Sequence, residues 1–243
     1  MAKTPEVKPK GGFKNTYLIF YNSVSAIAWL VVFFRGYFAY QRMGFAGVHG
    51  ELGEFWTWTQ TAALMEVFHA MFGTYSPSKP LPMAQCDRMI KITEANKFPG
   101  IVRAPVMTTV MQVASRLLLT WGIIYPFPHL SAYPTFTTML LAHSVTEIIR
   151  YGYFALTLSG QNPGILSWLR YNTFFVLYPL GIASECSLIY KAVGPAGDID
   201  PRLPYVLYAI LAIYVPGSHI LYTYMMKQRN KVMKGKATEK KLQ

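Results

Sequence analysis

Charged side chains are scarce in this sequence. They make up 14% of its 243 residues, whereas hydrophobic residues make up 52%. A soluble domain usually carries about 25% charged residues. Acidic residues are the scarcest, with 11 Asp and Glu against 23 Lys and Arg. This composition argues against a soluble domain and indicates a membrane protein.

Several catalytic and structural motifs are also missing. The sequence has no glycine-rich phosphate loop, no G-x-S-x-G nucleophile elbow and no Cys-x5-Arg phosphatase loop. Its two cysteines, Cys86 and Cys186, do not make a disulfide framework, and we expect both to be inert. No cleavable signal peptide is expected, because the polar N-terminal segment precedes an apolar run that is too long for one.

Six apolar stretches are long enough to cross a bilayer core of roughly 30 Å. We therefore predict an all-α, polytopic membrane protein, in which a bundle of six transmembrane helices forms one domain over residues 17–226, between polar tails at 1–16 and 227–243. The predicted spans are Tyr17–Phe38, Phe55–Tyr75, Val106–Phe127, Phe136–Leu158, Tyr171–Tyr190 and Tyr205–Met226.

Basic residues are distributed unevenly between the two sides of these spans. Most lie in the tails and in the loops on the same side, whereas the opposite loops hold Arg42, Lys191 and Arg202. Cytosolic segments carry such an excess, so we predict cytosolic termini and no nucleic-acid partner, despite a net charge of +12. The C-terminal KKLQ places Lys240 and Lys241 as in a dilysine retrieval signal of the endoplasmic reticulum.

The longest predicted loop, roughly Ser76–Pro105, joins the second and third spans. Its middle part, QCDRMIKITEANK, has apolar residues spaced as in an interfacial helix, beside Arg88, Lys91 and Lys97. A solvated loop explains the same pattern equally well, and so does a segment that faces an anionic ligand.

Glu185 lies in the fifth predicted span, where an ionisable carboxylate costs roughly 2.5 kcal/mol or more and marks a candidate functional site. Tyr178 precedes it by seven residues, about two helical turns, so the two side chains share one face. A phenol and a carboxyl group on one face are a candidate general acid/base pair. Pro179 and Gly181 lie between them and predict a kink at that point. A tyrosine at the interface and a glutamate paired to an arginine is the structural alternative.

Other polar residues lie inside predicted spans. Arg116 in the third span needs an acidic partner, water or a ligand, and Gln112 lies one turn earlier on the same face. In the fourth span, Glu147 is spaced to contact Arg150 and Tyr151. We expect Glu147 to hold helices together, while the arginines are candidates for orienting a substrate.

Glu66 and His69 form an E-x-x-H pair in the second predicted span. Di-iron bundles need two such pairs with further carboxylates, and the sequence has no second pair. We therefore expect a buried hydrogen-bonded pair, no metal site and no cofactor.

Four segments carry a resemblance to a known family. LRYNTFFVLYPLGIASE closely resembles the signature of the very-long-chain 3-hydroxyacyl-CoA dehydratases, also called protein-tyrosine-phosphatase-like proteins. LMEVFHAMFG, VMQVASRLLLTWGI and HSVTEIIRYGYFAL resemble further blocks of that family, in the same order. The likeness covers about residues 15–226, although the Ser76–Pro105 loop is longer than in the family's shorter forms.

The resemblance implies a six-span enzyme of the endoplasmic reticulum that converts (3R)-3-hydroxyacyl-CoA to trans-2-enoyl-CoA during fatty-acid elongation. It implies that Tyr178 and Glu185 are catalytic. The arginines in the matching blocks, Arg116, Arg150 and Arg170, are implied to have a supporting role. Tyr151, Gln112 and Gly181 complete the set of candidate supporting residues.

The expected partners are a long-chain 3-hydroxyacyl-CoA, membrane lipids and other elongation enzymes. An apolar tunnel between helices suits the acyl tail, and the CoA end is expected on the cytosolic side, near Arg170, Lys91, Lys97 and Arg103. Which catalytic residue acts as the base is open at this point. The alternatives are a membrane transporter, for which no repeat or pair of broken half-helices is evident, and a non-catalytic scaffold of the elongation complex.

Overall fold

The computed structural model describes residues 12–71, 104–161 and 163–241, and every regular element among them is a helix. The predicted all-α class is therefore confirmed for these residues. Most of the Ser76–Pro105 loop, including Cys86, lies outside the described residues. The elements are α1 (Phe13–Ala62), α2 (Leu64–Met71), α4 (Ala104–Leu117), the π-helix η1 (Leu118–Ile124), the 3-10 helix η2 (Pro128–Ala132), α5 (Pro134–Leu158), α6 (Gly164–Asn172), α7 (Phe174–Ile199) and α8 (Leu203–Lys241).

The first helix is broken at Gly44, which has φ +68° and ψ −166°. This is a conformation that glycine adopts readily and other residues avoid. The Arg35 guanidinium donates to the Glu51 carbonyl at 2.5 Å, and the Tyr21 hydroxyl donates to the Ala62 carbonyl at 3.3 Å. The two arms of α1 therefore run antiparallel, and a single glycine makes the turn for which a longer loop was expected.

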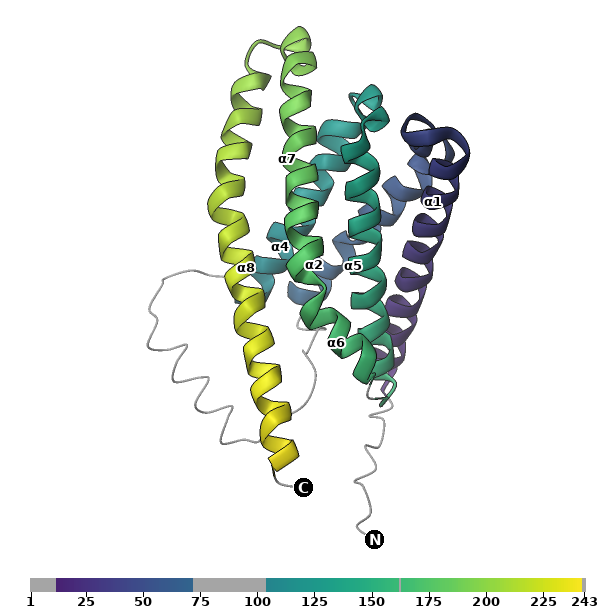
Figure 1. Ribbon diagram of the computed structural model, residues 1–243, viewed down its shortest axis with the longest axis vertical. Coiled ribbons are helices and arrows are strands. Elements are labelled where there is room, and N and C mark those ends of the chain that lie inside the picture. Colours follow the sequence, from purple (N-terminus) through teal and green to yellow (C-terminus); the bar gives the residue numbers. More distant parts are fainter. Residues whose placement is uncertain (1–11, 72–103, 162, 242–243) are drawn as a thin grey trace.

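Helix α5 lies between α1 and α7, and α8 packs against the other side of α7 (Figure 1). Helices α1 and α5 approach closely at Gly36, where a Cβ would lie 2.8 Å from Cδ2 of Leu140 and that side chain would have to shift. The start of α1 and the end of α8 lie at the same, lower end of the molecule in Figure 1. The central position of α5 brings its polar residues within reach of several neighbouring helices.

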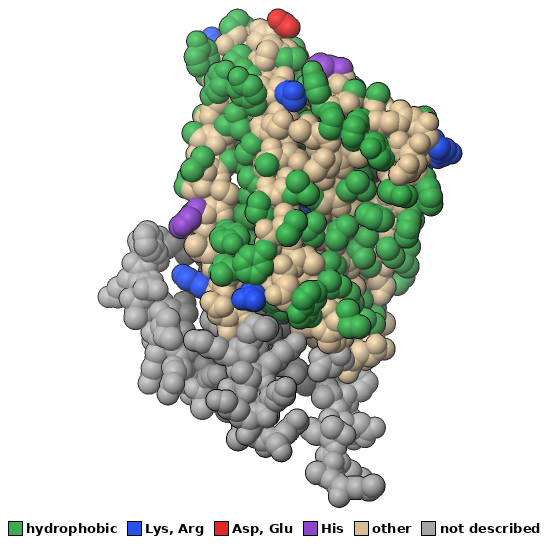
Figure 2. Space-filling model, viewed as in Figure 1, with side chains coloured by type: hydrophobic (Ala, Val, Ile, Leu, Met, Phe, Trp, Pro, Cys, Tyr) green, Lys and Arg blue, Asp and Glu red, His purple; other side chains and the backbone are tan. Residues whose placement is uncertain are grey.

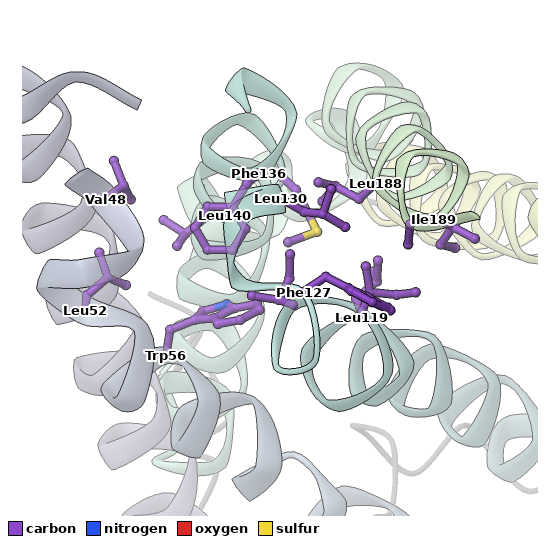
Figure 3. Close-up of a cluster of buried hydrophobic side chains, with 14 of the residues drawn as sticks. Val48, Leu52, Trp56, Leu119, Phe127, Leu130, Phe136, Leu140, Leu188 and Ile189 are labelled. Carbon is purple, nitrogen blue, oxygen red and sulfur yellow. The ribbon is translucent and has the colours of Figure 1, made fainter. Parts of the chain in front are cut away.

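The hydrophobic core lies where these helices meet (Figure 3). Trp56 from the second arm of α1 packs edge-to-face on Phe136 of α5, with ring centroids 5.3 Å apart. Leu188 and Ile189 of α7 reach the same cluster and are fully buried. Aromatic pairs of this kind stabilise a core by about 0.5–1.5 kcal/mol beyond the area they bury.

Hydrophobic side chains cover much of the face in Figure 2, and few charged side chains appear on it. Two segments, Phe13–His69 and Leu203–Asn230, are long and apolar enough to cross a membrane. A third is present if α6 and α7, which are bent by 48° relative to each other, count as one span. The described residues thus contain two candidate membrane spans, or three if α6 and α7 count as one, and the division into six spans remains a prediction.

A 48° bend lies at Thr173, between α6 and α7, and Pro179, where we expected a kink, lies inside α7. The Thr173 hydroxyl donates to the Leu169 carbonyl at 2.8 Å, and the Thr173 backbone N–H shares that acceptor. Such bonding of a threonine hydroxyl to a carbonyl one turn earlier often bends helices. Tyr178 and Glu185 consequently lie on one uninterrupted helix, α7.

Candidate active site

Glu185 is held between three helices. It lies on α7 and is almost fully buried, with 6% of its surface exposed. Nε2 of His143 on α5 lies 2.7 Å from its Oε1, and the Tyr214 hydroxyl on α8 donates to its Oε2 at 3.0 Å. Among the described residues, the arginine partner that we considered for Glu185 is not found, and its two carboxylate oxygens contact a histidine and a tyrosine.

Gly181 lies beside the His143 imidazole. It is buried one turn before Glu185 on the same face of α7. A Cβ built at Gly181 would lie 3.8 Å from Nε2 and 3.9 Å from Cδ2 of His143. A Cβ at residue 181 would therefore be in ordinary van der Waals contact with the imidazole.

Tyr178 lies two turns before Glu185 and is half-buried. Its hydroxyl donates to the backbone carbonyl of Ser218 on α8 at 2.9 Å, and its ring lies 6.1 Å from that of Tyr222. The described contacts join Tyr178 to α8 and Glu185 to α5 and α8, without a hydrogen bond between the two. Both groups lie along the seam between α7 and α8, with Gly181 between them.

A second polar cluster is centred on Glu147, which is completely buried on α5. The Arg116 guanidinium forms an ion pair with its Oε1, and Arg150 donates to its Oε2 from Nε at 2.8 Å and also from Nη2. Arg116 thus has the acidic partner that its position in the third predicted span required, and Glu147 joins α4 to α5 as expected.

The same cluster extends to α2 through Glu66. Arg150 contacts this carboxylate with two parallel hydrogen bonds of 2.6 Å, a bidentate geometry that strengthens an arginine–carboxylate pair. The Tyr151 hydroxyl also donates to Glu66, and not to Glu147. The predicted Glu66–His69 pair is therefore not the arrangement in the structure, where His69 Nε2 contacts the Tyr17 hydroxyl at 3.0 Å.

The remaining candidate residues lie apart from both clusters. The Gln112 side chain is exposed on α4. Arg170 on α6 stacks its guanidinium on the rings of Phe154, at 4.2 Å, and Tyr153, at 4.8 Å. Its Nη1 is buried without a hydrogen-bond partner. Lys91, Lys97 and Arg103, our other candidates for the CoA end, lie outside the described residues.

Sequence reasoning missed His143 and Tyr214. A signal for His143 is present, because it precedes Glu147 by four residues and so shares its helix face. Tyr214 has no such signal, since it meets Glu185 only through the packing of α8 on α7. Within the part of the chain that the structure describes, no three His, Cys, Asp or Glu residues are placed to hold a metal ion. The groups around Glu185 are suited to proton transfer.

Comparisons with known proteins give a consistent picture. The family described as protein tyrosine phosphatase-like protein, PTPLA, matches residues 88–235. The chain is 37% identical to a probable very-long-chain (3R)-3-hydroxyacyl-CoA dehydratase of Schizosaccharomyces pombe, over 93% of this chain and 97% of the relative. It is 33% identical to the dehydratase PASTICCINO 2 of Arabidopsis thaliana, over 90% and 94% of the two chains. It is 29% identical to dehydratase 1 of Mus musculus, over 95% and 78%. No solved structure matches.

Proposed function

This chain belongs to the protein tyrosine phosphatase-like (PTPLA) family, and from that premise we propose that it dehydrates long-chain and very-long-chain (3R)-3-hydroxyacyl-CoA to trans-2-enoyl-CoA. The family resemblance seen in four sequence segments is confirmed by these matches. The observation that carries the proposal is the buried carboxylate of Glu185, which lies on the same helix as Tyr178. His143 and Tyr214, from two other helices, contact this carboxylate.

Dehydration requires the loss of a proton from C2 and the protonation of the hydroxyl that leaves C3. In the free protein Glu185 accepts a hydrogen bond from Tyr214, whereas Tyr178 donates one to Ser218. We therefore assign Glu185 as the base and Tyr178 as the acid.

In this assignment Glu185 takes the C2 proton, and the electron pair of the broken C–H bond forms the C2=C3 double bond. The C3–O bond breaks as Tyr178 gives its proton to the departing hydroxyl, which leaves as water. The proton on Glu185 then returns through solvent to the Tyr178 oxygen, which closes the cycle. No step needs a cofactor.

The remaining candidate residues support the site indirectly in this proposal. Arg116, Arg150 and Tyr151 are occupied by Glu147 and Glu66, so they fix the position of α5 relative to α2 and α4. Gly181 keeps the face between Tyr178 and Glu185 clear. Gln112 is exposed on α4, so we assign it no contact with the substrate.

The placement of the enzyme follows from the sequence pattern. Residues 17–226 form the six-span catalytic domain in the endoplasmic reticulum membrane, and the tails at 1–16 and 227–243 are cytosolic, with Lys240 and Lys241 as a retrieval signal. The CoA end of the substrate stays on the cytosolic side, where the unpartnered Nη1 of Arg170 is a phosphate contact. The other elongation enzymes supply the hydroxyacyl-CoA and consume the enoyl-CoA.

The direct test uses purified protein in detergent or liposomes with a long-chain (3R)-3-hydroxyacyl-CoA. Mass spectrometry should detect the enoyl-CoA product, which is lighter than the hydroxyacyl-CoA substrate by the mass of one water. The Glu185→Gln protein is the control. Folded wild-type protein that leaves the hydroxyacyl-CoA unchanged would contradict the proposal, and a transporter or scaffold would then have to be tested.

A further inference from the structure

The contact between His143 and Glu185 has a role that the proposed acid/base pair does not explain. The side chains of both residues are more than nine-tenths buried, and only 2.7 Å separates Nε2 of His143 from Oε1 of Glu185. His143 contacts no other carboxylate oxygen among the described residues. The buried imidazole of His143 thus contacts one oxygen of the proposed base.

The unpartnered nitrogen of His143 indicates how this contact is made. Nδ1 is buried and has no hydrogen-bond partner. A neutral imidazole carries a proton on one nitrogen only, and a buried N–H without an acceptor is rare. The proton is therefore best placed on Nε2, so that His143 donates to Glu185 and Nδ1 keeps an unused lone pair.

Both oxygens of Glu185 are then fixed from outside its own helix. His143 on α5 holds Oε1, and Tyr214 on α8 holds Oε2. Each carboxylate oxygen has two acceptor positions, so each still has a free lone pair. The carboxylate is thereby oriented and still able to accept a proton.

We infer that His143 is a positioning residue for dehydration: its Nε2–H holds the Glu185 carboxylate in the orientation from which it removes the C2 proton. This inference rests on the proposed dehydratase function. We expect His143 to affect the chemical step, because it orients the base and contacts no group that we assign to substrate binding. Misplacing a reacting group by about 1 Å can cost roughly 100-fold in rate.

A pair of amide variants tests this role. In His143→Gln the amide nitrogen reaches the position of Nε2, whereas in His143→Asn it reaches only the position of Nδ1. We expect Asn to lower kcat roughly 10- to 100-fold with little change in KM, and Gln to restore most of that loss. His143→Leu keeps an apolar body without a donor, and it should behave like Asn.

Thermal unfolding in detergent shows whether each variant is folded, and kcat is compared per folded molecule. If Gln, Asn and Leu are equally active, or if their losses only follow their melting temperatures, His143 is a packing residue and the inference is wrong. If the wild-type protein produces no enoyl-CoA, the proposed function fails as well. If the wild type is active and the Glu185→Gln variant is inactive, the proposed function stands. Equal activity of the His143 variants would then contradict only the positioning role.

Discussion

Glu147 and Glu185 are two buried carboxylates in one helix bundle, and their surroundings differ. Glu147 is completely buried between the guanidinium groups of Arg116 and Arg150. Glu185 is 6% exposed, and its hydrogen-bond partners among the described residues are His143 and Tyr214. The first carboxylate is neutralised by permanent cations, and the second is held by groups that can exchange protons.

This difference separates a structural role from a chemical one. Removing one partner from a buried ion pair leaves an uncompensated charge and costs about 3–5 kcal/mol. Glu147 is therefore expected to contribute mainly to stability, together with Glu66 on the other side of Arg150. Glu185 can change its protonation state without leaving an arginine unpaired, so it is expected to contribute mainly to rate.

The largest effect is expected from removing either member of the acid/base pair. Glu185→Gln and Tyr178→Phe nearly keep side-chain volume, so each protein should fold. Each variant loses a proton-transfer function, which contributes roughly 100- to 10,000-fold in rate. Enoyl-CoA formation by purified protein measures this loss. Tyr190→Phe is a matched control, because Tyr190 lies exposed on the same helix.

A double variant sharpens the same test. If Tyr178 and Glu185 act as one unit, losing both should be little worse than losing one. Near-normal turnover by folded Glu185→Gln protein would contradict the assignment of Glu185 as the base. The catalytic carboxylate would then have to be sought at Glu147 or Glu66.

Glu147→Gln should show the opposite pattern. It leaves Arg116 and Arg150 without a buried carboxylate between them, so we expect a loss of about 3–5 kcal/mol in stability. The fraction that still folds should retain most of its kcat. Thermal unfolding and activity per folded molecule, measured on one preparation, separate these effects. A stable Glu147→Gln protein with no turnover would reverse the roles of the two carboxylates.

The helical class was predictable from composition and apolar run length, but the contacts of the site were not. Arg116 was expected to need an acidic partner, water or a ligand inside its apolar helix, but its pairing with Glu147 comes only from the packing of α4 on α5. The Gly44 turn was missed because one glycine replaces an expected loop. Bonding of Glu185 to Tyr214 depends on how α8 packs against α7, and spacing within a single helix gives no information about neighbouring helices.

Tyr214→Phe should have a smaller effect than Tyr178→Phe, although both remove the same hydroxyl. The change removes the donor at Oε2 of Glu185 and leaves the His143 contact in place. A hydrogen bond to a charged group contributes about 1.5–3 kcal/mol, and 1.36 kcal/mol is about tenfold in rate. With one of two donors left, we expect kcat to fall roughly 10- to 30-fold. A loss as large as that of Tyr178→Phe would contradict a merely orienting role for Tyr214.

The smallest effect is expected from Gly181→Ala, which tests whether substrate passes between Tyr178 and Glu185. The added Cβ would lie 3.8 Å from His143, an ordinary contact, and alanine favours a helix by about 0.5–1 kcal/mol over glycine. Stability should therefore be unchanged or slightly higher. Gly152→Ala is the matched control, because its Cβ would make a similar 3.6 Å contact with Leu166.

The methyl group at residue 181 projects into the face that carries both catalytic candidates, so it should crowd the bound hydroxyacyl group. One methylene in a binding pocket is worth about 1–3 kcal/mol, or 10- to 200-fold. Because the helix can shift slightly around a single methyl group, we expect kcat/KM to fall by no more than the lower end of that range, roughly threefold to tenfold. Gly152→Ala should leave it unchanged. Equal kcat/KM in the two alanine variants would mean that the substrate does not pack against residue 181.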